Sequence, residues 1–118
     1  PQVWIDAEQS RQVLLNLLNN SLDAMPAGGL VRINVSRAAR ANHAMIAIRI
    51  VDEGPGIPES VRNRLFEPFF TTKPQGTGLG LPVAHQIVRQ MGGSLQAQVN
   101  DDRGMTFSIV LPAEAHQA

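Results

Sequence analysis

Glycine occupies every second position from Gly76 to Gly80, directly before a predicted helix that carries Pro82 in its first turn. Proline is favoured at that place because its missing N–H would have no partner there. The apolar spacing predicts a helix over 81–91, which ends at Gly92-Gly93. The start of a helix offers unpaired backbone N–H groups, and glycine lets an anion approach the backbone closely. This segment therefore predicts a phosphate-binding site.

The composition excludes several classes of protein. The 118 residues are enough for one domain with its own core. The formal net charge is zero, which argues against a nucleic-acid partner. The absence of cysteine excludes disulfides and thiolate metal sites. No apolar run approaches the ~20 residues that cross a bilayer, so we expect no membrane segment in this chain.

Hydrophobic periodicity predicts alternating helices and strands. Helices are predicted over 7–25, 59–65 and 81–91, and strands over 3–5, 31–36, 46–50, 94–100 and 105–111. A polar turn is expected over 37–43, and Leu14, Leu18 and Leu22 are expected to form the buried stripe of the first helix. This order favours an α+β two-layer sandwich, in which helices cover one face of a mainly antiparallel sheet.

Asparagines interrupt the first predicted helix although asparagine is a poor helix former. Asn16 and Asn20 are one turn apart and share a face. A solvated face explains either residue alone. Because an amide oxygen is a suitable Mg²⁺ ligand beside phosphates, the pair in this setting favours a metal-nucleotide site.

Asp52 ends an apolar strand and is followed by Gly54 and Gly56. A carboxylate at this place can bond its own turn, or it can accept a hydrogen bond from an exocyclic amino group at a pocket mouth. Beside the other motifs we favour the acceptor. The Phe66–Phe70 cluster is interpreted as an aromatic latch for a binding loop that also carries Lys73. The three histidines show no metal-ligand spacing.

Four motifs in this order resemble the catalytic, ATP-binding domain of bacterial two-component sensor histidine kinases. That family belongs to the superfamily shared with type II topoisomerase, mismatch-repair and chaperone ATPases. The asparagine box is similar to Asn16–Ser21, the first glycine box to Asp52–Ile57, the phenylalanine box to Phe66–Phe70 and the second glycine box to Gly76–Leu81. The resemblance covers nearly the whole chain and implies that residues 1–118 form one catalytic domain.

The resemblance implies a mixed sheet under three helices, with ATP and Mg²⁺ between two helices and a mobile lid over about 53–80. Asn20 resembles the Mg²⁺ ligand, and Asp52 resembles the acceptor of the adenine amino group. The matching nucleotide contacts are Asn20, Asp52, Gly54, Gly56, Ile57, Thr77, Gly78, Leu79, Gly80, Leu81 and Thr106. Thr106 resembles a residue of the adenine water network, and Lys73 is a candidate phosphate contact.

One departure from the superfamily pattern bears on the reaction. The hydrolytic relatives place a glutamate one turn before the metal asparagine, where this chain has Asn16. An amide cannot act as a general base, so Asn16 is expected to position groups while the phosphoryl group goes to a protein. An ATPase or protein-serine kinase of the superfamily, and a non-catalytic nucleotide sensor, are the alternatives.

The resemblance also implies partners that this chain does not contain. The phosphoacceptor histidine is expected on a dimerisation domain upstream, because the family's histidine box does not occur here. A response regulator is the expected downstream partner. The domain is expected to be cytoplasmic, in a parent protein that a membrane segment can anchor.

Overall fold

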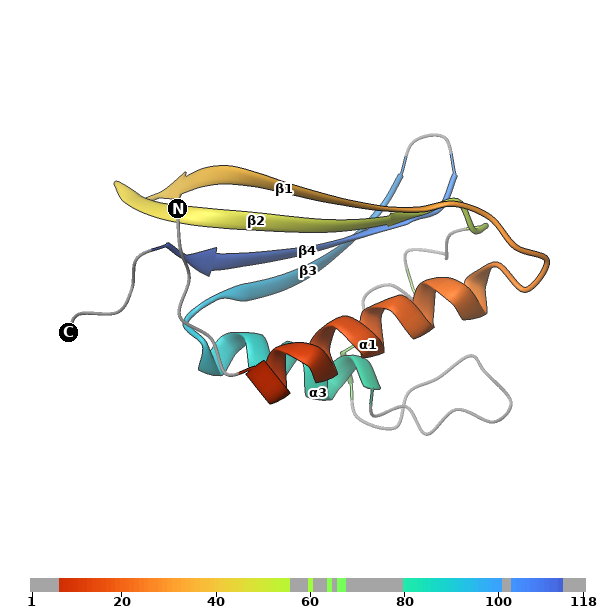
Figure 1. Cartoon of the computed structure of the whole chain (residues 1–118), viewed down its shortest axis with the longest axis horizontal. Coiled ribbons are helices and arrows are strands. Elements are labelled where there is room, and N and C mark those ends of the chain that lie inside the picture. Colours follow the sequence, from red (N-terminus) through yellow and green to blue (C-terminus); the bar gives the residue numbers. More distant parts are fainter. Residues whose placement is uncertain are drawn as a thin grey trace.

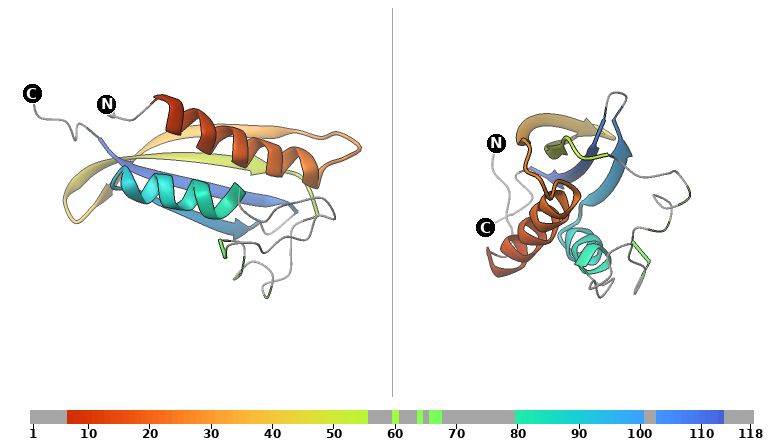
Figure 2. Two further views of the ribbon diagram at one scale, coloured as in Figure 1. Left: turned by 90° about the horizontal axis from the view of Figure 1, so that it is seen from below. Right: turned by 90° about the vertical axis from the view of Figure 1, so that its right-hand side faces the viewer.

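In the part of the chain that the structure describes, two helices lie on one face of a four-stranded sheet (Figures 1 and 2). The computed structural model describes residues 7–55, 60, 64, 66–67, 80–100 and 103–113. In chain order the described elements are α1 (Ala7–Ala24), β1 (Val31–Arg40), β2 (His43–Asp52), α3 (Gly80–Gln90), β3 (Ser94–Val99) and β4 (Met105–Pro112). The strand order is β1-β2-β4-β3, and each neighbouring pair is antiparallel. The predicted α+β architecture, with helices on one face of the sheet, is confirmed.

Some predicted elements fall outside this description. Residues 3–5, the first predicted strand, are not among the described residues, and of the predicted helix over 59–65 only two residues are described. The expected count of three helices is therefore not confirmed, since the described elements include two helices. Within the described sheet the strands are all antiparallel, which is simpler than the mixed sheet that the resemblance implies.

The hairpin between β1 and β2 is longer than predicted. Its two-residue turn consists of Ala41 and Asn42, whose φ angles are 50° and 68°. Positive φ at both central residues is typical of a type I′ turn, whose twist matches that of the flanking strands. The pairing therefore continues to Arg40 and His43. The polar turn predicted over 37–43 is present, but it is limited to Ala41 and Asn42, because polar side chains are tolerated on an exposed edge strand and the strands extend further.

The buried face of α1 matches the predicted leucine stripe only in part, since Leu18 packs partly buried against the core. Val13, Leu17 and Ser21 are buried, whereas Leu14 and Leu22 are 37% and 59% exposed. Leucines surround much of this helix, so their spacing alone does not select one face. Contact with the sheet and with α3 selects it instead.

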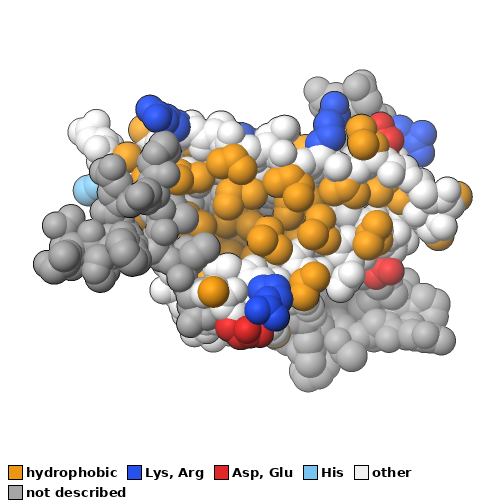
Figure 3. Space-filling view, viewed as in Figure 1, with side chains coloured by type: hydrophobic (Ala, Val, Ile, Leu, Met, Phe, Trp, Pro, Cys, Tyr) orange, Lys and Arg blue, Asp and Glu red, His pale blue; other side chains and the backbone are white. Residues whose placement is uncertain are grey.

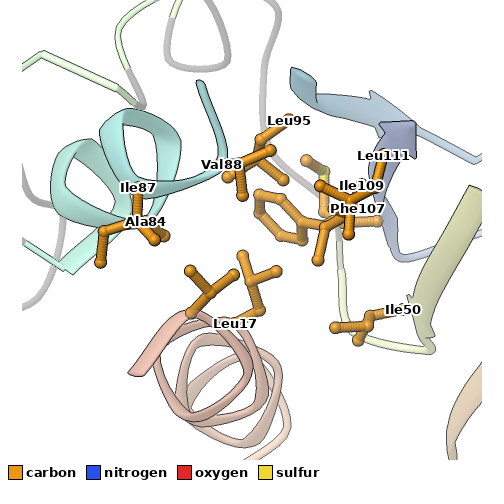
Figure 4. Packing of buried hydrophobic residues seen from close by; sticks show 11 residues of the cluster. Leu17, Ile50, Ala84, Ile87, Val88, Leu95, Phe107, Ile109 and Leu111 are labelled. Atoms are coloured by element: carbon orange, nitrogen blue, oxygen red, sulfur yellow. The ribbon is translucent and has the colours of Figure 1, made fainter. Parts of the chain in front are cut away.

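Phe107 of β4 lies at the centre of the core, between the sheet and the two helices (Figure 4). It is 1% exposed and belongs to one cluster with Leu17 of α1, Ile50 of β2 and Val88 of α3. Fully burying a side chain of this size stabilises a fold by ~1.5–3 kcal/mol. This packing holds both helices against the sheet beside the end of β2.

The edge strand β1 extends past the cover of the helices. Ile33 and Val35 are paired with Ile50 and Ile48, so they share the helix-facing side of the sheet. They are nevertheless 52% and 67% exposed. Figure 3 shows the hydrophobic side chains that gather between α1 and the sheet on this side of the molecule.

The end of α3 has a clear local cause. Gly92 has a φ of 85°, and its N–H donates to the carbonyl of Arg89 at 3.0 Å. The N–H of Gly93 donates to the carbonyl of Val88, also at 3.0 Å. These two bonds make a Schellman motif, which satisfies carbonyls that the helix leaves unpaired. The predicted end of this helix at Gly92-Gly93 is confirmed.

Candidate nucleotide site

Asp52 is the last residue of β2, and its carboxylate is buried with 1% exposure. Its Oδ1 accepts hydrogen bonds from the backbone N–H of Gly54 at 2.9 Å and of Met105 at 3.1 Å. Its Oδ2 is also buried and accepts no hydrogen bond from the described residues. The turn interpretation therefore accounts for one oxygen only. The other oxygen remains available to a donor from a ligand.

Two glycines let the backbone pack closely around this carboxylate. A Cβ atom on Gly54 would lie 3.0 Å from Cβ of Ala24, at the end of α1, and 3.3 Å from Oδ1 of Asp52. A Cβ atom on Gly104 would lie 2.0 Å from the carbonyl oxygen of Asp52, and Gly104 has a φ of 88°. The end of α1, the end of β2 and the start of β4 therefore meet at Asp52.

Asn16 joins α1 to the start of α3. Its Nδ2 donates to the carbonyl oxygen of Gly80, the first residue of α3, at 3.0 Å. Asn20 lies one turn further along the same face of α1, towards Ala24, and is half-buried. The structure thus brings the asparagine box beside the second glycine box. An amide oxygen at the position of Asn20 fits the ligand chemistry of Mg²⁺.

Several predicted contacts cannot be located. Gly56, Ile57, Lys73, Thr77, Gly78 and Leu79 lie outside the described residues, as does most of the predicted lid over 53–80. Of the second glycine box, Gly80 and Leu81 are described, and Leu81 packs in part against the core. The start of α3 is therefore the described part of the predicted phosphate site.

Thr106, the candidate for the adenine water network, is the second residue of β4 and is half-buried. Neighbouring residues of a strand point to opposite faces, and Met105 and Phe107 are the buried neighbours of Thr106. The Thr106 hydroxyl donates to Oδ1 of Asn100 at 2.6 Å. Sequence reasoning missed Met105, whose backbone N–H supports the carboxylate. The residue after Gly104 was a possible signal, because Gly104 is the position that approaches Asp52.

Sequence reasoning also missed Ser21. This side chain is 0% exposed, and its hydroxyl has no hydrogen-bond partner among the described residues. A possible signal was its place in a leucine-rich helix, one turn after Leu17, directly beside Asn20. A polar residue on the buried face of a helix needs a partner or a function.

Phe66 of the phenylalanine box stacks on His85 of α3, with ring centroids 4.7 Å apart and an interplanar angle of 24°. Both residues line an open pocket of about 470 Å³ together with Pro82, Gln86, Arg89 and Gln90. Burial and, to a lesser extent, the charge of Arg89 lower the pKa of His85 below its ordinary value of 6.5. The described part of the phenylalanine box thus contacts α3 through Phe66, and Phe69 and Phe70 lie outside the described residues.

Neither described helix is long and apolar enough to cross a membrane. Within the described ranges, no three His, Cys, Asp or Glu side chains gather in a way that could hold a metal ion.

The chain is similar in sequence to a known protein family and to individual kinases. A profile of the family described as "Histidine kinase-, DNA gyrase B-, and HSP90-like ATPase" matches residues 5–115. The chain is 39% identical over 110 residues to Sporulation kinase C of Bacillus subtilis (strain 168), covering 93% of this chain and 25% of that protein. It is 38% identical over 112 residues to the sensor histidine kinase ZraS of Escherichia coli (strain K12), covering 95% and 23%. The chain thus spans about a quarter of these relatives.

Solved structures have the same fold. The mycobacterial sensor histidine kinase MprB superposes with a TM-score of 0.81 at 33% identity, over 94% of this chain and 74% of that one. The catalytic domain of the histidine kinase ThkA gives a TM-score of 0.74 at 32% identity, over 94% and 70%. Full-length ShkA in complex with AMPPNP gives 0.75 at 29% identity, over 93% and 22%.

Proposed function

Because this chain belongs to the histidine kinase-, DNA gyrase B- and HSP90-like ATPase family, we propose that it is the ATP-binding catalytic domain of a sensor histidine kinase. It binds Mg-ATP and donates the γ-phosphoryl group to a histidine on a neighbouring domain. The observation that carries the nucleotide assignment is the buried carboxylate of Asp52, which is held through Oδ1 and has no partner for Oδ2 among the described residues.

Asp52 is proposed to recognise the adenine base of ATP. Two backbone N–H groups hold its Oδ1, so the direction of the free Oδ2 is set before a ligand arrives. Oδ2 accepts a hydrogen from the exocyclic amino group of adenine, and Gly54 keeps the approach open. A pre-positioned acceptor loses little freedom when it binds, which strengthens the contact.

The start of α3 is proposed to hold the phosphates. Backbone N–H groups at a helix start attract anions, and Asn16 fixes this end of α3 through Gly80. Thr77, Gly78, Leu79 and Lys73 keep their proposed roles as phosphate contacts. Asn20 would hold Mg²⁺, which neutralises phosphate charge when bound. Gly56 and Ile57 are proposed to line the base.

Transfer to a protein is favoured over hydrolysis because of Asn16. Its amide cannot accept a proton, and its Nδ2 is already engaged with Gly80. The acceptor histidine is proposed to lie on a dimerisation domain of the parent protein, with a response regulator downstream. The proposal includes a cytoplasmic location, a third helix over 59–65 and a lid over about 53–80 that orders on nucleotide.

The proposal is tested with the chain and γ-labelled ATP, alone and with a phosphoacceptor helix pair from a sensor kinase. Binding of Mg-ATP and label on the acceptor histidine only in the presence of this chain are the expected results. Release of phosphate at the rate of a dedicated ATPase would identify a hydrolase instead. Binding without either reaction would identify a nucleotide sensor. Absence of ATP binding would contradict all three functions.

A further inference from the structure

Two buried oxygen atoms lack hydrogen-bond partners among the described residues, and they are Oδ2 of Asp52 and Oγ of Ser21. The two side chains are 1% and 0% exposed. A serine inside a helix commonly donates to the carbonyl one turn earlier, but the Ser21 hydroxyl makes no such bond. Buried polar groups in folded proteins are nearly always paired, so both oxygens require an explanation.

The fold places both oxygens at one corner of the molecule. Leu17, Ser21 and Ala24 follow one another along the inner face of α1, and Leu17 packs in the same cluster as Ile50 of β2. Ala24 in turn touches Gly54, the residue two positions after Asp52. Ser21 therefore lies on α1 between Leu17, which packs in the core, and Ala24, which packs against Gly54. This side of α1 faces the end of β2.

The hydrogen-bonding properties of the Asp52 carboxylate and the Ser21 hydroxyl complement each other. A carboxylate oxygen accepts hydrogen bonds only, whereas a hydroxyl can also donate one. Adenine presents an amino donor beside ring nitrogens that accept, N1 on one side and N7 on the other. Resting on the proposed function, we propose that Ser21 is a second determinant of base recognition. Its hydroxyl donates to a ring nitrogen next to the amino group that Asp52 accepts, directly or through one water molecule.

The Ser21→Ala variant separates this role from a structural one. The substitution removes a buried hydroxyl that has no partner among the described residues, and with it a desolvation cost, so the midpoint of thermal unfolding should stay equal or rise. The affinity for ATP should nevertheless fall roughly three- to tenfold, as expected for one lost hydrogen bond. The matched control is Ser108→Ala, which removes a half-buried hydroxyl from the outer face of β4 and should leave ATP affinity unchanged.

Binding of 1-deaza-ATP and 7-deaza-ATP, in which CH replaces a ring nitrogen, identifies the contact. For one of these analogues, wild type and Ser21→Ala should bind equally, because the partner of the hydroxyl is gone. The inference is overturned if Ser21→Ala binds ATP as tightly as wild type does. It is also overturned if the variant lowers the affinities for ATP and for both analogues by the same factor. Failure of wild type to bind ATP would instead reject the proposed function itself.

Discussion

The side-chain amide of Asn16 donates a 3.0 Å hydrogen bond to the carbonyl oxygen of Gly80, a residue 64 positions later in the chain. The bond connects the middle of α1 to the first residue of α3. It therefore sets where the start of α3, the proposed phosphate site, lies relative to Asn20.

Asn16→Asp should disturb this connection. The substitution replaces an N–H donor by a carboxylate that faces the carbonyl oxygen of Gly80, and two acceptors repel each other. We expect the free energy of unfolding to fall by ~0.5–2 kcal/mol, because the site is only half-buried. Mg-ATP affinity should fall roughly tenfold. Asn34→Asp on the exposed strand β1 makes the same chemical change elsewhere, and equal effects of the two variants on ATP binding would contradict the assignment.

Asp52 should make the site select ATP over GTP. Guanine presents a carbonyl acceptor where adenine presents an amino donor, so a fixed carboxylate would repel it. Asp52→Asn should weaken ATP binding by roughly five- to a hundredfold and should reduce discrimination, because the amide can turn a donor towards guanine. Titration of both nucleotides measures this, with the exposed Asp23→Asn as control. Equal binding of ATP and GTP by wild type would reject the adenine assignment.

Gly104→Ala should be strongly destabilising. Its φ of 88° strains any other residue, and a Cβ atom there would lie 2.0 Å from the carbonyl oxygen of Asp52. Gly28 offers a matched control, because its φ is 96° and a Cβ atom there meets nothing within 4 Å. Gly28→Ala should cost about 1 kcal/mol from strain alone. In urea unfolding Gly104→Ala should cost clearly more, and a similar cost at both sites would show that the backbone contact is unimportant.

Stability should decrease in mildly acidic solution because of His85. Its pKa is lowered in the fold, first by burial and then by the charge of Arg89. The unfolded chain therefore takes up this proton first, and stability falls as the pH drops below about 6.5 and through the folded pKa. His85→Asn should remove this part of the pH dependence, and Arg89→Gln should reduce it. Thermal unfolding between pH 7.5 and 5 measures the slope, and an unchanged slope in His85→Asn would contradict the prediction.

Local backbone chemistry explains where prediction from the sequence succeeded. The end of α3 at Gly92-Gly93 could be predicted because glycine adopts the left-handed conformation that a Schellman motif needs. The strand preceding Asp52 could be predicted from its alternating side chains. The turn over 37–43 was predicted too long, because Ala41 gives no signal of the positive φ that limits the turn to Ala41 and Asn42.

Within the candidate site, the motifs name Asn16, Gly80 and Asp52, and the structure shows the contacts that these three residues make. The bond from Asn16 to Gly80 could not be predicted, because it depends on the packing of two helices against the sheet. The choice of Met105 over Thr106 depends on which face of β4 is turned to Asp52. A shift of one residue along a strand reverses the face, and spacing alone does not settle it.

The sequence by itself determined which positions carry residues with special local properties. These are the glycines, the asparagine pair and the carboxylate at the end of a strand. The properties of these residues are local, so they can be predicted from the sequence without knowledge of the fold. Only the tertiary structure decided that Leu17 and Ser21, and not the Leu14 and Leu22 stripe, are buried. It also decided that Oδ2 of Asp52 has no partner among the described residues. These outcomes depend on contacts between elements that are far apart in the chain, because the packing of all elements decides which side chains are buried and which are hydrogen-bonded.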